Sequence, residues 1–74
     1  MENIITFPSM TAALKARDTL RRHKIAAGMM RTPARYRKGS CGYSLSIGRE
    51  LDRAVEILNS SRIPYKGVFA DDDR

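Results

Sequence analysis

The segment best suited to chemistry is Lys38-Gly39-Ser40-Cys41-Gly42-Tyr43, which holds the only cysteine of the 74-residue chain. A thiol acts as a nucleophile or as a carrier only in its thiolate form, which nearby cations favour. Four cationic side chains precede the cysteine within ten residues: Arg31, Arg35, Arg37 and Lys38. Cys41 is therefore the predicted reactive residue.

The neighbours of Cys41 suit the approach of a donor molecule. Gly39 and Gly42 leave the backbone bare on both sides of the thiol. The hydroxyl of Ser40 or Ser9 could donate a hydrogen bond to an anion held there. The predicted substrate-binding residues are Ser9, Arg31, Arg35, Arg37, Lys38, Ser40 and Gly42. The alternative is that the lone cysteine is only a small buried apolar residue.

Other chemistries lack the residues that they need. One cysteine excludes an internal disulfide and a CxxC redox pair, and with His23 as the only histidine it excludes a self-contained zinc site. The segment around Cys41 also lacks the GK[ST] ending of a phosphate-binding loop. His23 is a helix-end cation rather than a base for Cys41, and Met29 and Met30 are strand and core filler. We therefore expect no bound metal or cofactor.

The charge distribution favours an anionic partner. The net charge is +6, and residues 1–40 hold nine Lys and Arg against only Glu2 and Asp18. Nucleic acid, a phosphate-bearing cofactor or an acidic protein face would suit such a surface, although simple solubilisation explains it equally well. The N-terminus lacks the pattern of a signal peptide, and no apolar run approaches the roughly 20 residues of a membrane span. We expect a cytoplasmic protein without membrane contact.

The first half of the chain predicts a strand, a helix and a second strand. Asn3–Phe7 is a short β-rich run that a proline ends. A helix capped by Ser9 or Thr11 runs to about His23. Ile25–Thr32 is the second strand, again followed by a proline. The small and apolar stripe predicted to face the core is Ala13, Ala16 and Leu20.

The second half predicts a loop, a strand, a helix and a last strand. Residues 33–40 are a basic loop, and the period-two alternation of Tyr43–Ile47 indicates a strand. An amphipathic helix begins at Leu51 and closes at residues 59–61. Tyr65–Ala70 is the last strand, and residues 71–74 are an acidic tail on this single domain, residues 1–74.

The order β-α-β-β-α-β predicts an α+β, ferredoxin-like split βαβ fold. Right-handed crossovers give a four-stranded antiparallel sheet of order 4-1-3-2 with both helices on one face. The end of the first strand, the start of the first helix and the start of the third strand then meet at one edge. Cys41 should therefore lie near Pro8 and Ser9, beneath the basic loop. A second copy would stabilise so small a domain, so a homodimer is a further expectation.

A basic RNA- or protein-binding module is the alternative function. RNA-recognition modules share this element order, but residues 38–45 lack the aromatics with which those modules stack bases. An electrostatic RNA contact through the first helix and the basic loop stays open. A third reading is a regulatory domain that binds an anionic ligand between two copies, with Ser44 and Ser46 contributing.

The chain resembles the small bacterial selenium/sulfur (Se/S) carrier-like proteins, a family often left as a domain of unknown function. The likeness covers about residues 3–70 and rests on Phe7-Pro8-Ser9, the helix with Ala13 and Leu20, Thr32-Pro33, and Cys41-Gly42 eight residues later. The resemblance implies a ferredoxin-like fold. It also implies a carrier, more than an enzyme, whose Cys41 holds a persulfide- or selenide-level atom and passes it from donor to acceptor proteins. The basic run Arg35-Tyr36-Arg37-Lys38 is unusual for the family.

Overall fold

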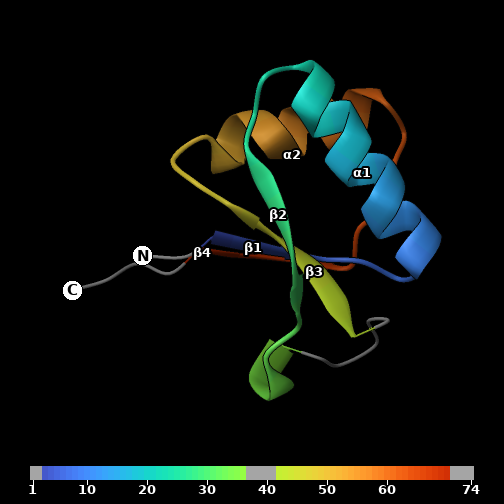
Figure 1. The fold of residues 1–74 in the computed structure, drawn as a ribbon, viewed down its shortest axis with the longest axis vertical. Coiled ribbons are helices and arrows are strands. Elements are labelled where there is room, and N and C mark those ends of the chain that lie inside the picture. Colours follow the sequence, from blue (N-terminus) through green and yellow to red (C-terminus); the bar gives the residue numbers. More distant parts are fainter. Residues whose placement is uncertain (1–2, 37–41, 71–74) are drawn as a thin grey trace.

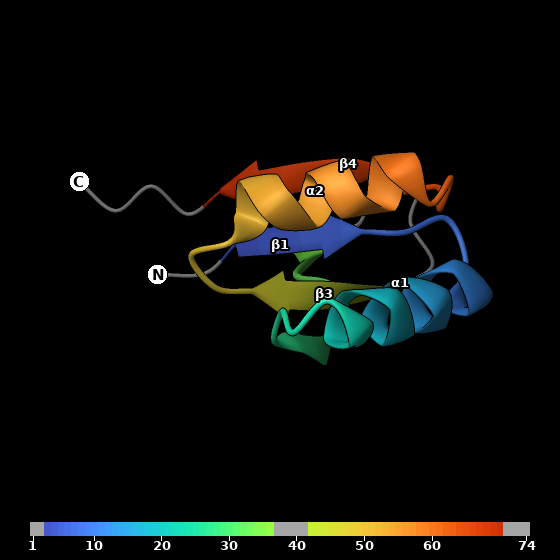
Figure 2. The same cartoon turned by 90° about the horizontal axis from the view of Figure 1, so that it is seen from above.

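The computed structural model describes residues 3–36 and 42–70. Its sheet is antiparallel in the order β2-β3-β1-β4, and both helices lie on one face (Figures 1 and 2). The predicted α+β split βαβ fold is thereby confirmed, because 4-1-3-2 is the same order counted from the other edge. The elements are β1 (Asn3–Thr6), α1 (Met10–Arg22), β2 (Ala27–Arg31), the 3-10 helix η1 (Ala34–Tyr36), β3 (Tyr43–Ile47), α2 (Leu51–Ser60) and β4 (Gly67–Ala70).

The strand register brings the predicted edge together. Thr6 near the end of β1 pairs with Ser44 in β3, and Arg31 at the end of β2 pairs with Tyr43. The chain leaving β1 then enters α1 at the same edge (Figure 2). The last residue of β1, the start of α1 and the start of β3 therefore lie at one end of the sheet, as the topology predicts.

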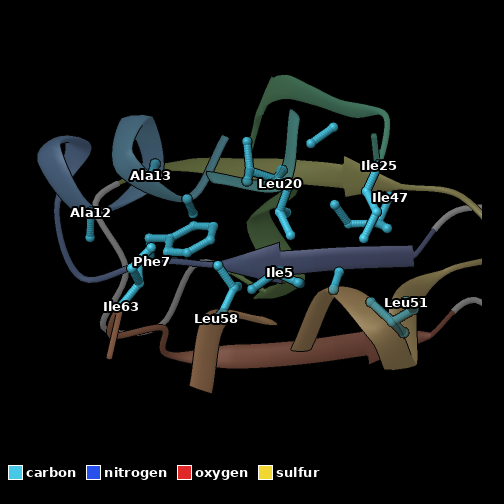
Figure 3. Close-up of a cluster of buried hydrophobic side chains, with 14 residues drawn as sticks. Ile5, Phe7, Ala12, Ala13, Leu20, Ile25, Ile47, Leu51, Leu58 and Ile63 are labelled. Atoms are coloured by element: carbon cyan, nitrogen blue, oxygen red, sulfur yellow. The ribbon is translucent and has the colours of Figure 1, made fainter. Parts of the chain in front are cut away.

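The main core lies between the sheet and the two helices (Figure 3). Ile5, Phe7 and Leu45 are fully buried beneath the helices. The predicted stripe is confirmed, since Ala13, Ala16 and Leu20 are all buried on α1; the two alanines let this helix approach the sheet closely. The matching residues of α2 are Leu51, Ala54 and Leu58.

Several element boundaries differ from the predicted ones. β1 ends at Thr6 instead of Phe7, and β2 ends at Arg31 instead of Thr32. β2 begins at Ala27, because the amide of Ile25 still donates to Leu20 O at the end of α1. β4 begins at Gly67, two residues after Tyr65, whose hydroxyl donates to Asn59 Oδ1 at 3.0 Å. The predicted loop contains the turn η1, closed by a 2.9 Å hydrogen bond from the Tyr36 amide to Pro33 O.

The two helices end in the same way. Ile25 N donates to Leu20 O at 2.9 Å, and Ile63 N donates to Leu58 O at 3.0 Å. The residue before each isoleucine is left-handed: φ is 63° at Lys24 and 58° at Arg62. This is the Schellman ending, whose buried apolar pair packs the chain back onto the helix and whose left-handed position usually holds glycine. Here a basic residue fills that position in both helices.

Candidate functional site

The face of the sheet that the helices leave open is partly covered by the segment after β2. Phe69 pairs with Ile4, so both lie on the face opposite Ile5. The Tyr36 ring stacks on Phe69, with ring centroids 4.2 Å apart and planes at 18°. The segment therefore leaves one edge strand, β2, and reaches the other edge strand, β4, on the helix-free side (Figure 1). We call residues 32–36 the covering arm.

Gly67 makes room for this stack. A Cβ at Gly67 would lie 2.8 Å from Cε2 of Phe69 and 3.2 Å from Oγ1 of Thr6. Any larger residue would push the ring of Phe69 away from its present position against β4. The contact between the arm and the sheet thus depends on a glycine within a strand, at a point of close approach.

Buried hydroxyl groups lie on the same face. Thr6, Thr32 and Ser44 are each at most 2% exposed. The oxygens Thr32 Oγ1 and Ser44 Oγ are 2.6 Å apart, so one hydroxyl donates to the other. Buried polar groups are tolerated when they are hydrogen-bonded in this way. The pair fixes the start of the arm to the beginning of β3.

Gly42 lies directly after the predicted reactive cysteine and is also held. Its carbonyl accepts from the Thr32 amide at 2.9 Å. Its φ of 95° lies in the left-handed region that glycine occupies without strain. Both ends of the segment that joins β2 to β3 are therefore anchored: Thr32 and Tyr36 at its start, and Gly42 at its end.

Half of the predicted site residues lie outside the described part of the chain. These are Cys41, Arg37, Lys38 and Ser40, so their grouping stays a prediction. Of the others, Arg31 and Gly42 lie close together at the end of the β2–β3 pair, because Arg31 pairs with Tyr43 and the Thr32 amide donates to Gly42 O.

Ser9 and Arg35 occupy different parts of the fold. Ser9 is the N-cap of α1, and its Oγ accepts from the Ala12 amide at 3.1 Å. Arg35 lies on the helix-free side, its Cζ 5.0 Å from the centroid of the Tyr36 ring. Ser9 belongs to the helix-covered side, so the described residues do not bring these two together.

The aromatic pair of Tyr36 and Phe69 is not predicted by the sequence analysis above, in which Tyr36 belongs to a basic run and Phe69 to the last strand. The available signal was Gly67, two residues before Phe69 and therefore on the same face of the strand. Such a spacing permits a ring to lie flat along the strand, but it does not reveal what stacks on that ring.

Two cations of the predicted site, Arg31 and Arg35, form no ion pair with a carboxylate of the described residues. Within residues 3–36 and 42–70 the ion pairs are Arg17–Asp18 and Arg53–Glu50, each 4.0 Å long. Neither includes Arg31 or Arg35. Among these same residues no three His, Cys, Asp or Glu side chains gather as a metal site would require, and no helix is long and apolar enough to cross a membrane.

Comparison with known proteins identifies the family. The family model described as "Putative Se/S carrier protein-like" matches residues 2–70. The chain belongs to this family. The match confirms the resemblance drawn from Thr32-Pro33 and Cys41-Gly42, and it spans the whole β2–β3 connection. Neither a search of curated proteins nor a search of solved structures found a match.

Proposed function

We propose that this Se/S carrier-like protein holds a persulfide- or selenide-level atom on Cys41 and transfers it from a donor protein to an acceptor protein. The observation that carries the proposal is the family match over a chain that has a single thiol. A carrier needs only one nucleophilic sulfur and a surface that its partners can reach. It needs no second catalytic residue.

The transfer is a displacement at sulfur. The Cys41 thiolate attacks the terminal sulfur of a donor persulfide, R–S–SH. The S–S bond of the donor breaks, its inner sulfur leaves as the thiolate R–S⁻, and a new S–S bond joins the terminal sulfur to Cys41. Unloading repeats the step with an acceptor thiolate as the nucleophile. If selenium replaces the terminal sulfur, the same displacement breaks one bond to selenium and forms another. No external oxidant or reductant is consumed in either case.

The surrounding cations support the thiolate and the charged donor. Arg31 and Arg35 have no ion pair among the described residues, so their charge is available to an anion. In the proposal Arg37 and Lys38 add to that charge, Ser40 and Ser9 donate hydrogen bonds, and the bare backbone at Gly42 admits the donor. A cation close to a thiol stabilises its deprotonated form.

The test is the intact mass of the protein after incubation with glutathione persulfide under non-reducing conditions. We expect the wild-type chain to gain the mass of one sulfur atom and to lose it when dithiothreitol is added. The matched control, Cys41→Ser, should gain nothing. Wild-type protein should also be alkylated by iodoacetamide faster than free cysteine at neutral pH. A chain that never gains sulfur and alkylates no faster than a free thiol would contradict the proposal.

A second candidate function is electrostatic RNA binding. It is favoured by the cations of α1 that lack ion pairs among the described residues, such as Arg21 and Arg22. Stacking of bases on Phe69 is disfavoured, because Tyr36 already covers that ring. An RNA gel shift that weakens steeply with salt and is unaffected by Cys41→Ser would select this function over the carrier.

A further inference from the structure

A second basic site lies on the helix side of the molecule, in a cleft of about 390 Å³. One wall is the exposed side of α1, with Lys15, Thr19 and Arg22. The other wall is the turn after α2, with Ser61 and Arg62, above the buried side chain of Ile63. All of these residues belong to the described part of the chain, and none of them is in the carrier site.

The charges that line this cleft are predominantly positive. Lys15, Arg22 and Arg62 face a single carboxylate, Asp18. Asp18 is 4.0 Å from Arg17, which is not in the lining, and neither ion pair of residues 3–36 and 42–70 includes any of the three lining cations. Among the side chains of residues 3–36 and 42–70 that line the cleft, positive charge is therefore in excess.

The backbone of Arg62 allows its conformational strain to be tested separately from its part in binding. Arg62 is left-handed, with φ at 58°, in a position where glycine would avoid steric strain. The same ending at Lys24 supplies the natural comparison, because Lys24 does not line this cleft.

We propose that the cleft binds the phosphate group of a small anion. Two guanidinium groups from different elements, Arg22 and Arg62, can each present paired N–H donors to phosphate oxygens. Lys15 adds a point charge, and the hydroxyls of Thr19 and Ser61 add donors. The volume is within the range of small-molecule sites, about 300–1,000 Å³. The site is independent of Cys41, so it stands whether or not the chain carries sulfur.

The test is a titration of the full ¹⁵N-labelled chain with inorganic phosphate and with pyrophosphate, at an ionic strength held constant with sodium chloride. We expect saturable amide shifts that are confined to the cleft and stronger with pyrophosphate. In Arg62→Gly the dissociation constant should rise by about fivefold or more, as expected for one lost charge-assisted contact. The melting temperature of that variant should nevertheless rise by about 2–4 °C, because strain is relieved.

Lys24→Gly is the matched control, since it removes the same strain and one positive charge outside the cleft. It should raise the melting temperature similarly and leave the dissociation constant unchanged. Arg22→Gln, at an exposed helix position, should weaken binding without the gain in stability. The proposal is overturned if Arg62→Gly binds like the wild type, if Lys24→Gly weakens binding as much, or if the shifts spread over the whole basic surface without saturating. An RNA oligonucleotide that binds while the cleft amides stay unshifted, with pyrophosphate not binding, also overturns it.

Discussion

At the scale of single residues, the contact between Tyr36 and Phe69 decides how the helix-free face is used. Stacked rings contribute roughly 0.5–1.5 kcal/mol beyond the area that they bury. The stack is possible only because Gly67 has no side chain where the ring of Phe69 lies. The absence of a Cβ at Gly67 therefore allows the covering arm, which leads to Cys41, to attach to the sheet through this stack.

Gly67→Ala should destabilise the protein by about 1 kcal/mol, because the new Cβ displaces Phe69 and weakens the stack. The free energy of unfolding in urea measures this. Gly28→Ala is the matched control, since it also lies in an edge strand and a Cβ there would have no neighbour within 4 Å. In a Tyr36→Ala background, Gly67→Ala should have a smaller effect. Equal losses in both backgrounds would show that the stack is not what the glycine protects.

Among the secondary-structure elements, α1 begins at a residue that has both a structural role and a role in the predicted site. Its first turn is capped by Ser9, a residue also predicted to contact the bound anion. No acidic residue lies in that turn, so the hydroxyl is the cap that the described structure provides. A loss of activity on mutating Ser9 could therefore come from an altered helix end instead of a lost contact.

Two substitutions separate these roles. Ser9→Ala should lower the free energy of unfolding by about 1 kcal/mol, since the Ala12 amide loses its acceptor. Ser9→Asp should keep the stability near that of the wild type, because aspartate is an equally good cap. It removes the hydroxyl donor and adds a negative charge, so persulfide loading of Cys41 should slow in Ser9→Asp. Unchanged loading there would remove Ser9 from the proposed site while leaving its capping role intact.

At the scale of the whole molecule, the sheet carries unequal layers on its two faces. The helix side holds the large buried cluster that includes Ile5, Phe7 and Leu45. Within residues 3–36 and 42–70, the other side is covered by the covering arm alone, with Tyr36 half-buried on Phe69. The helix side should therefore provide most of the folding free energy, which is about 3–5 kcal/mol for a domain of this size.

Substitutions on the two sides should differ accordingly. Leu45→Ala should cost about 3 kcal/mol and leave much of the protein unfolded at room temperature, since it opens a cavity in the core. Tyr36→Ala should cost only about 1 kcal/mol and keep the fold cooperative. Circular dichroism during urea unfolding distinguishes the two. Similar losses would mean that the arm is an integral part of the core.

Tyr36→Ala also tests whether the arm matters to the carrier. If anchoring of residues 32–36 helps to present Cys41, persulfide loading should slow in this variant although the protein stays folded. Loading at the wild-type rate would show that the hydrogen bonds of Thr32 to Gly42 and to Ser44 are sufficient to anchor the segment.

The order and type of the elements, the sheet order and the family can all be predicted from the amino-acid sequence. The alternation of Tyr43–Ile47 and the stripe of Ala13, Ala16 and Leu20 follow from which side of a strand or helix must be buried, and that is a local property. The strand order could be predicted because right-handed crossover connections leave few possible sheet topologies. The sequence also pointed to Cys41, which the family match spans without testing its role.

Which side chains from different elements become neighbours is known only from the folded structure. That Tyr36 stacks on Phe69, that Thr32 pairs with Ser44, and that Arg22 and Arg62 line one cleft could not be read from spacing. Each arrangement brings together residues from different elements, and each depends on where a turn places its side chain. A burial pattern in the sequence shows which face of a helix or strand is buried. The path of a loop, in contrast, depends on how the whole fold packs.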